Sequence, residues 1–165
     1  MILRGSAGGD SLGTRVTYLT MDPLGSSVGS SQVLAYVLRL ADRGVGIDLH
    51  SFEHEQNGEL RGVLEASGVR WSAHRFGARG ARGGLGRVAR LAHHIRGASL
   101  VHARSDMAAA AVMASSVDRW LWDVRSFWAD QKVATGVFAD GSPQARVFRR
   151  VERAAARRSD RGITL

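Results

Sequence analysis

Apolar residues recur along this chain in two alternating patterns, one typical of strands and one typical of helices. Short apolar or alternating runs predict strands over residues 15–20, 45–53, 69–75, 99–104 and 119–123, with a last strand starting at 162–165. Apolar residues spaced three and four apart predict helices over residues 31–44, 58–67, 87–96, 107–116, 127–138 and 143–158. Because each helix between two strands must lie against the sheet, this order predicts an α/β fold: a parallel sheet covered by helices on both faces.

The segments between these elements add local expectations. Asp106 precedes the alanine-rich helix 107–116 and is expected to be its N-cap. Residues 77–86 are rich in glycine and arginine and predict a flexible basic loop. Residues 1–14 are polar and glycine-rich, which predicts a flexible leader before a domain that spans residues 15–165. The last residues predict the start of a buried strand, so we expect this domain to be truncated at its C-terminal end.

The connection between the first strand and the first helix, residues 21–30, is rich in glycine and serine. A strand that leads through a glycine loop into a helix N-terminus is a common anion site, because free N–H groups and the helix dipole favour negative charge there. No Lys-Ser/Thr pair follows the last glycine, and the spacing Gly25-xxx-Gly29 misses the dinucleotide fingerprint. The candidate ligand-binding residues of this loop are Gly25, Ser27, Gly29, Ser30 and Gln32. The alternative is a turn that only needs the flexibility of glycine.

The formal net charge of +8 bears on the partners of the chain. Lys132 is the only lysine, and the arginines do not interleave with aromatic residues as they do in single-strand nucleic-acid platforms. No nucleic-acid motif is present, so we expect no nucleic-acid partner. An anionic membrane surface or a phosphorylated ligand explains the charge as well, and the loop 77–86 with Arg87 and Arg90 is the expected contact.

Composition excludes several further classes of protein. The chain has no cysteine, which rules out disulfides and thiolate chemistry, and no apolar run of about 18 residues that predicts a membrane span. The N-terminus is too polar for a secretory signal, so we expect a cytoplasmic location with peripheral membrane contact. His50, Glu53, His54 and Glu55 lack the spacing of a known metal site, and we expect no metal.

The order of landmarks along residues 15–165 resembles the N-terminal part of family 4 glycosyltransferases, which are retaining enzymes with the GT-B fold. The matching landmarks are Arg15–Thr20, Ser30–Val37, Leu40–Glu53, Val101-His-Ala-Arg-Ser105, Leu121-Trp-Asp-Val-Arg-Ser-Phe-Trp-Ala-Asp130 and Val151–Leu165. No single motif is diagnostic, but the ordered set is moderately specific. Many family members carry a histidine near this point, whereas this chain has Asp123 there. No histidine role is therefore carried over to Asp123.

The resemblance implies one Rossmann-like half of a two-domain enzyme that transfers a sugar from a nucleotide-diphosphate sugar to a hydroxyl acceptor. This chain would be the acceptor-side domain, and activity would require a C-terminal donor domain that carries a pair of glutamates. The co-substrate is the nucleotide-diphosphate sugar, and no cofactor is implied. Two alternatives remain open: half of a nucleotide-sugar epimerase, or a non-catalytic α/β module that binds an anionic sugar or a partner protein.

Polar residues follow the fourth and fifth predicted strands, where a parallel sheet binds ligands. Asp123 could accept hydrogen bonds from sugar hydroxyls or assist a proton transfer, and Arg125 could clamp a phosphate. The alternative is a salt bridge between the two that fixes the loop. His102 and Arg104 follow the fourth strand in the same way, although His102 could equally be a buried, hydrogen-bonded imidazole.

Three tryptophans surround this predicted edge. Trp120 and Trp122 lie in the fifth strand and are expected in the core, whereas Trp128 lies beyond it and is the candidate for stacking on a sugar ring.

Overall fold

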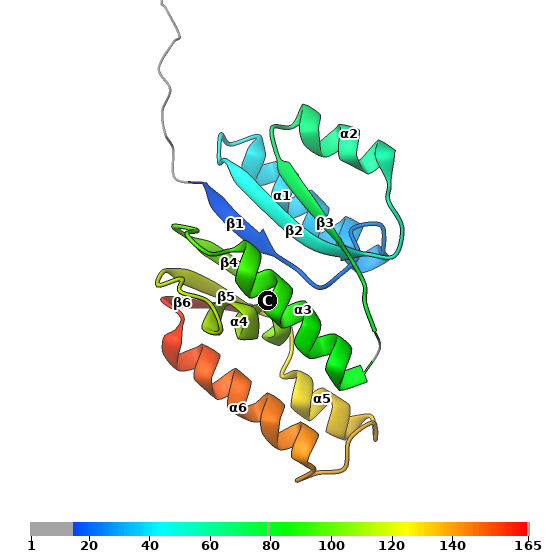
Figure 1. The fold of residues 1–165 in the computed structure, drawn as a ribbon, viewed down its shortest axis with the longest axis vertical. Helices are drawn as coiled ribbons and strands as arrows, with labels where there is room; N and C mark the ends of the chain where they lie inside the picture. The colour runs from blue at the N-terminus through cyan, green and yellow to red at the C-terminus, as the bar shows by residue number, and fades with distance from the viewer. Residues whose placement is uncertain (1–14, 79, 165) are drawn as a thin grey trace, which may run out of the picture.

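The computed structural model describes residues 15–78 and 80–164 and contains a six-stranded, all-parallel sheet with helices on both faces (Figure 1). The strands lie in the order β3-β2-β1-β4-β5-β6. They are β1 (Val16–Leu19), β2 (Ile47–Glu53), β3 (Arg70–Arg75), β4 (Val101–Arg104), β5 (Trp120–Val124) and β6 (Arg161–Thr164). The predicted α/β class, with a Rossmann-like parallel sheet, is confirmed.

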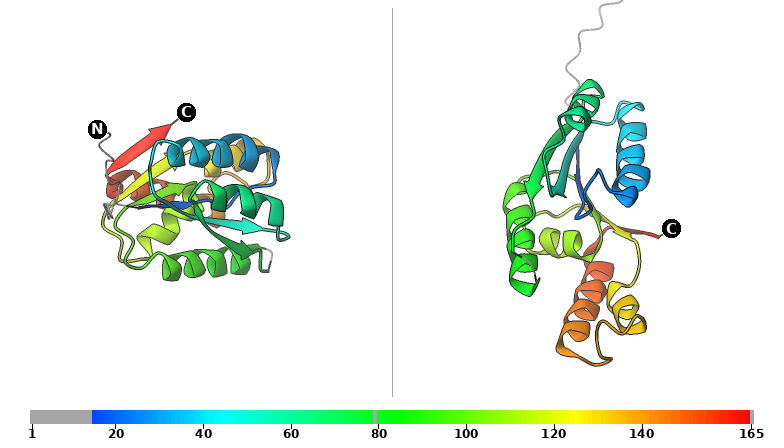
Figure 2. Two further views of the ribbon diagram at one scale, coloured as in Figure 1. Left: turned by 90° about the horizontal axis from the view of Figure 1, so that it is seen from above. Right: turned by 90° about the vertical axis from the view of Figure 1, so that its right-hand side faces the viewer.

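The helices lie in layers on either side of this sheet (Figure 2). They are η1 (Gly29–Leu34), α1 (Ala35–Ala41), α2 (Gly58–Ala66), α3 (Gly80–His94), α4 (Asp106–Met113), α5 (Trp128–Ala134) and α6 (Pro143–Arg158). The pair α1 and α2 covers one face of the sheet, and α3 and α4 cover the other. Helix α6 packs against α4 and α5.

Alternation along the strands divides the apolar residues between two cores. Tyr18 and Leu49 point toward α1 and α2, whereas Leu19 joins Trp120 and Trp122 under α4. Both tryptophans are 3% exposed, which confirms the core position expected for them. The alanines of α4 allow its backbone to approach the sheet closely, as its composition suggests.

Helix α3 begins at Gly80, so the prediction of a flexible loop over residues 77–86 is wrong from that residue onward. The glycines of this segment lower its intrinsic helix propensity, but packing overrides propensity here. Gly83 is buried, and a Cβ atom at this position would overlap the carbonyl oxygen of Ala78. Gly84 lies beside Met107 of α4, where a Cβ would be in ordinary contact. The close approach at Gly83 therefore requires glycine, and Leu91 and Val88 pack α3 against the core.

The two ends of the chain carried separate predictions. The predicted last strand forms β6, which pairs with β5, and Arg161, Gly162 and Ile163 are exposed in the described residues. Burial of this strand in a longer chain stays a prediction. The predicted leader, residues 1–14, lies outside the described residues. Within residues 15–78 and 80–164, no helix combines the length and apolar character needed to cross a bilayer.

The N-terminus of α4 is built differently from the prediction that Asp106 is its N-cap. Ser105 occupies the N-cap position, and Asp106 is the first residue of the helix, 5% exposed. Burial, followed by the nearby carboxylate of Glu152 from α6, raises the pKa of Asp106 to about 7. Glu152 is itself buried and accepts a 3.1 Å hydrogen bond from the backbone N–H of Ala129. The pair therefore ties α4, α5 and α6 together.

The raised pKa of Asp106 makes the free energy of unfolding depend on pH. The unfolded chain releases this proton near pH 4 and the folded chain near pH 7, so stability falls as pH rises between those values. Asp106→Asn removes the titration, and the wild-type protein should lose about 1.4 kcal/mol relative to this variant between pH 6 and 8. Urea unfolding of both proteins at several pH values measures the difference, in which the titrations of groups that do not interact with Asp106 cancel. Parallel pH profiles would contradict the assignment.

Candidate functional site

The candidate site lies where the strand order reverses, between β1 and β4. In open α/β sheets, ligands bind outside the carboxyl ends of the strands at this switch point. The residues that follow β1, β4 and β5 meet there, because the three strands are adjacent and parallel. Charged side chains at these three strand ends include Asp22, Arg104, Asp123 and Arg125.

Arg104 is the centre of the site. Its side chain is almost fully buried, and its guanidinium lies 3.3 Å from Asp22 Oδ2 and 3.3 Å from Asp123 Oδ2. Arg104 Nη2 also donates a 2.7 Å hydrogen bond to Gln32 Oε1. One buried cation thus compensates two carboxylates and joins the ends of β1, β4 and β5 to the first helix.

Asp123 forms its ion pair with Arg104 and not with Arg125. The sequence analysis offered a salt bridge between Asp123 and Arg125 as the alternative to a ligand-binding role. Burial by itself raises the pKa of Asp123, but the nearby His102 imidazole and the positive charges of Arg104 and Arg125 outweigh burial and lower it. His102 Nε2 lies 3.6 Å from Asp123 Oδ2, slightly longer than a hydrogen bond. Arg125 instead donates to Gln32 Oε1, so Gln32 receives two guanidinium groups.

Two tyrosines complete the wall around His102. The His102 ring lies 4.5 Å from the ring of Tyr18 and 5.6 Å from the ring of Tyr36, measured between centroids. Burial raises the pKa of both tyrosine hydroxyls, so both stay protonated. Tyr18 is fully buried, whereas Tyr36 is 40% exposed and forms the outer side of this aromatic group.

The loop after β1 is shorter and more ordered than its sequence predicts. The helix expected to start at residue 31 begins earlier, with the π-helical turn η1 that carries Gln32. Ser26 Oγ accepts a 3.0 Å hydrogen bond from the N–H of Gly29, in the manner of a capping side chain. Local π-helix is rare and occurs frequently at functional sites. Here it directs Gln32 toward Arg104 and Arg125.

The other predicted residues of this loop occupy different environments. Gly29 is buried, and a Cβ there would overlap the carbonyl oxygen of Pro23. Gly25, Ser27 and Ser30 are exposed, and the Ser30 hydroxyl donates a 3.3 Å hydrogen bond to the Ser27 carbonyl. Gly29 therefore has a clear packing role, while the three exposed residues stay predictions as ligand contacts.

Gly29→Ala is expected to lower the free energy of unfolding by about 1 to 3 kcal/mol, the usual cost of overpacking. The new methyl group must displace the backbone at Pro23, which moves the loop that carries Gln32. Gly25→Ala is the matched control, because nothing lies within 4 Å of its Cβ position. Denaturant unfolding of the two variants gives the comparison. Equal stabilities would show that Gly29 is not required by packing.

Several buried polar atoms at this edge have no protein partner. Among the described side chains, they include His102 Nε2, Ser105 Oγ, Asp123 Oδ1 and Arg125 Nη1. Ser105 also has φ of 85°, a strained conformation for a residue other than glycine. Buried polar atoms are nearly always hydrogen-bonded in folded proteins, and exceptions need a reason. They gather at the carboxyl ends of β4 and β5, where internal water molecules or a ligand would supply the missing partners.

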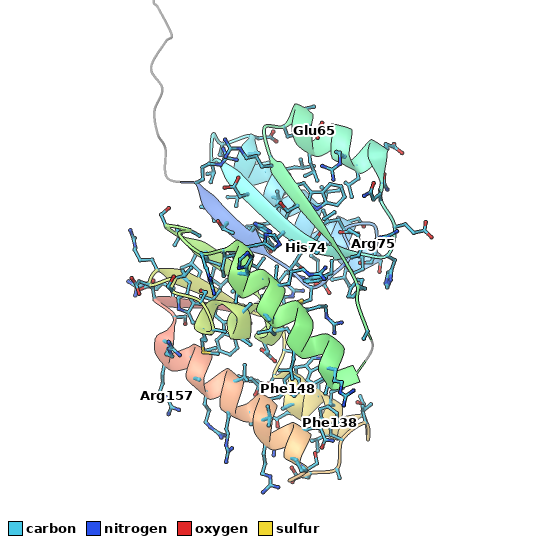
Figure 3. All side chains as sticks on the ribbon, in the orientation of Figure 1. Glu65, His74, Arg75, Phe138, Phe148 and Arg157 are labelled. Atoms are coloured by element: carbon cyan, nitrogen blue, oxygen red, sulfur yellow. The ribbon has the colours of Figure 1, made fainter. Side chains whose placement is uncertain are left out.

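Trp128 is the first residue of α5, and its ring packs against aromatic residues of α6 and of the segment before it. The ring centroid lies 4.2 Å from that of Phe148 and 5.4 Å from that of Phe138; both phenylalanines are labelled in Figure 3. Lys132 Nζ lies 5.3 Å from the centre of the ring. These contacts give Trp128 a packing role in the structure, and stacking on a sugar stays a prediction.

The histidines include a second group on the opposite face of the sheet. His50 Nδ1 and His74 Nε2 are 3.0 Å apart, and the ring of His94 from α3 lies 4.8 Å from that of His74. Burial, with a further contribution from His94, lowers the pKa of His50 and His74 to about 4. Within the part of the chain that the structure describes, no group of three or more His, Asp or Glu side chains is arranged to hold a metal ion.

Comparison with known proteins does not name a family. No protein-family model matches the chain, and a search of curated proteins finds no match. The functional argument for this chain therefore rests on its own residues.

Sequence reasoning missed Asp22, Ser105 and the tyrosine pair. The signal for Asp22 and Ser105 was present, because both directly follow predicted strands, as Asp123 and Arg125 do. Tyr18 and Tyr36 looked like ordinary core residues of a strand and a helix. Only the pairing of β1 with β4 brings Tyr18 beside His102.

Proposed function

We propose that this chain is the acceptor-side domain of a retaining glycosyltransferase that uses a nucleotide-diphosphate sugar as donor. The observation that carries the proposal is the set of unpartnered polar atoms at the ends of β4 and β5: Ser105 Oγ, Asp123 Oδ1, Arg125 Nη1 and His102 Nε2. Hydroxyl, carboxylate, guanidinium and imidazole groups together suit a polyhydroxylated ligand that also bears negative charge. The ordered resemblance to family 4 glycosyltransferases supports the same reading.

Each side chain has a distinct task under this proposal. The lowered pKa keeps Asp123 ionised, so its Oδ1, which is buried without a protein partner, would accept a hydrogen bond from an acceptor hydroxyl that enters this strand end. Arg125 is less buried than Arg104 and keeps one unpartnered nitrogen, which suits it to an anionic oxygen of the donor. Arg104 holds Asp123 and Gln32 in place and is a positioning residue.

Catalysis under this proposal is electrostatic. Positively charged groups and helix N-termini stabilise the diphosphate leaving group, and a second domain supplies the glutamates and most of the donor contacts. The acceptor-side domain orients the attacking hydroxyl, which converts a bimolecular encounter into an oriented one.

The 165-residue protein should bind sugars without turning them over. The assay combines saturation-transfer NMR on simple glycosides with a test for transfer or hydrolysis of labelled nucleotide-diphosphate sugars. We expect glycoside binding and no turnover, because the donor-side groups are not part of this domain. Turnover by the 165-residue protein would contradict this division of roles, and failure to bind any sugar would contradict the proposed function itself.

A further inference from the structure

Three histidines lie together where helix α3 covers β2 and β3. His50 of β2 and His74 of β3 are each 8% exposed, and His74 is labelled in Figure 3. His94 is the last residue of α3 and is exposed; its ring centroid lies 4.8 Å from that of His74 and 6.1 Å from that of His50. We call these three residues the histidine cluster. It lies on the opposite face of the sheet from the side chains around Arg104.

The two buried histidines are joined by one hydrogen bond. His50 Nδ1 and His74 Nε2 are 3.0 Å apart, and the two ring planes differ by only 9°. One of these nitrogens must carry a hydrogen and donate while the other accepts, which a pair of neutral imidazoles satisfies. A fully protonated imidazole has a hydrogen on both nitrogens. Once both rings are charged, two N–H groups face each other and the contact must open.

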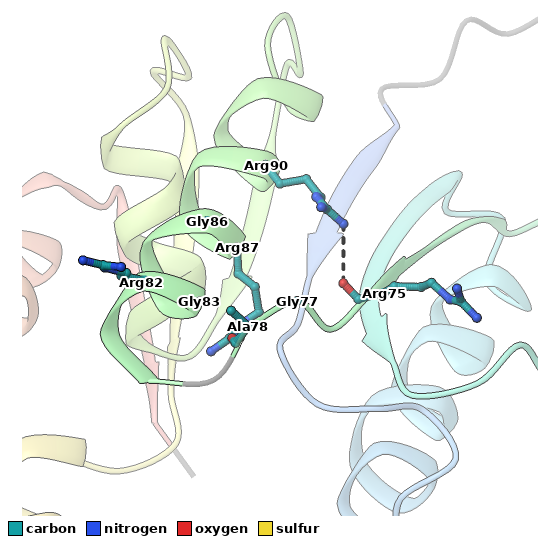
Figure 4. A pocket seen from close by; sticks show the side chains of 8 residues that line it. All are labelled: Arg75, Gly77, Ala78, Arg82, Gly83, Gly86, Arg87 and Arg90. Carbon is teal, nitrogen blue, oxygen red and sulfur yellow. Dashed lines mark hydrogen bonds between the residues drawn. The ribbon is translucent and has the colours of Figure 1, made fainter.

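Positively charged groups of α3 face the buried pair. Arg90 lies close enough to lower the pKa of His74, and its Nη1 lies 3.4 Å from the Arg75 carbonyl oxygen at the end of β3 (dashed line in Figure 4). His94 faces both buried rings, and its own ring centroid lies 5.7 Å from that of His93. Any positive charge on the pair is therefore added beside other cations, which disfavours it.

A polar hollow of about 400 Å³ opens beside the cluster at the amino ends of β1, β2 and β3. Its wall includes the titratable and charged side chains of Asp48, His50, Arg70, His94 and Arg96. Asp48 is already paired with Arg15 at 3.0 Å and lies 3.9 Å from Arg70. Its attraction to His50 is weaker than the effects of burial and of His94. Solvent protons thus reach the cluster, but the nearby carboxylate does not offset their charge.

Apolar contacts hold α3 on the sheet around the cluster. Leu91 and Ile95 of α3 are buried, and the Phe52 ring lies 5.4 Å from that of His74, between centroids. This burial is the main cause that lowers the pKa of His50 and His74 to about 4. Histidines exposed by an opening of α3 would titrate near pH 6.5. The open form therefore binds more protons than the docked form, and docking weakens as pH falls from about 6.5 to 4.

We propose that the histidine cluster is an acid-sensitive latch: neutral histidines hold the C-terminal half of α3 on β2 and β3, and their protonation releases it. The latch joins three elements that are distant in sequence, and its release uncovers the apolar side chains of Phe52 and Leu91. Helix α3 also packs against α4, which begins directly after Ser105, so release removes one support of that strand end. The inference uses no part of the proposed sugar transfer.

The first test is amide hydrogen exchange of the 165-residue protein between pH 7 and 5, corrected for the intrinsic pH dependence of exchange. Protection around Leu91 should fall about twentyfold if one buried histidine regains its ordinary pKa on opening, and about five hundredfold if both do. At pH 5 this exchange should be nearly independent of dilute urea, which marks a local opening. Unchanged protection, or the same urea dependence in α3 as in β5, would overturn the latch.

The double variant His50→Asn/His74→Gln removes the titration and keeps the contact. The amide of Asn takes the place of Nδ1 in His50, and that of Gln takes the place of Nε2 in His74, so a neutral hydrogen bond is retained. Protection in α3 should then change less than about threefold between pH 7 and 5. The matched control is His93→Gln, which removes an exposed histidine of the same helix and should behave like the wild-type protein. An acid-induced loss in the double variant as large as in the control would refute the role of the pair.

The ring nitrogens of the wild-type protein test the latch without any substitution. At pH 6 both buried rings should give the ¹⁵N NMR signals of neutral imidazole, although a histidine of ordinary pKa is mostly protonated there. On further acidification, protonation of these rings and loss of protection in α3 should occur over the same pH range. Two protonated rings beneath an α3 that keeps its protection would contradict the proposal.

Discussion

Replacement of Arg104 with methionine is expected to lower the free energy of unfolding by about 3 to 5 kcal/mol. The variant keeps a long side chain but leaves Asp123 buried without its main cationic partner, and it also removes the charge beside Asp22. A buried carboxylate without compensation is among the costliest defects that one substitution can create. Urea unfolding of the wild-type and variant proteins measures the loss.

The control for this substitution is Arg153→Met on the exposed surface of α6, where we expect a change within about 0.5 kcal/mol. The stability of Arg104→Met should also recover as pH falls through the pKa of the abandoned carboxylate, because protonation removes the buried charge. A loss no larger than that of the control would show that Arg104 does not hold the strand ends together.

Arg125→Ala should instead reduce function with little change in stability. Arg125 is half-buried, its one hydrogen bond goes to Gln32, and its Nη1 has no protein partner. If the chain belongs to the proposed transferase, we expect the variant of that enzyme to lose roughly 2 to 4 kcal/mol of transition-state stabilisation. That corresponds to about a 30- to 1000-fold lower rate, at 1.36 kcal/mol for each factor of ten.

Asp123→Asn serves as a comparison, because it distinguishes a role in the reaction from a role in stability less clearly than Arg125→Ala does. Asp123 is 7% exposed and paired with Arg104, so loss of its charge should lower both the rate and the melting temperature. Arg125→Ala is the more specific probe for this reason. A large fall in melting temperature for Arg125→Ala, with activity reduced only in proportion to unfolded protein, would assign Arg125 a structural role.

The strands and most helices could be predicted because their signals are local. Alternation places Leu19 and Trp120 on one face and Tyr18 on the other, and burial of both faces follows from the sheet alone. Helix α3 could not be predicted from residue 80, because its glycine-rich first turns have a low helix propensity and the close approach of Gly83 to the Ala78 carbonyl has no signal in the sequence pattern. The strained backbone of Ser105 has no sequence signature either.

The sequence could place the candidate site at one edge of the sheet, but it could not predict which side chains contact one another there. The rule for parallel sheets locates Asp123, Arg125 and Arg104 at the carboxyl ends of strands. It does not state which carboxylate meets Arg104, because its partners Asp22 and Gln32 are 82 and 72 positions away in the chain. Strand order and the π-helical turn determine those contacts, and both depend on tertiary packing.

The most direct test of the proposed site is an amide NMR titration of the 165-residue protein with simple glycosides and nucleotide-diphosphate sugars. The largest shift changes should occur at Gln32, Ser105 and residues 123–125, and they should be lost in Arg125→Ala while the spectrum stays that of a folded protein. Shift changes confined to other parts of the protein, or none at the ends of β4 and β5 at millimolar ligand, would contradict the assignment of this edge as a sugar-binding site.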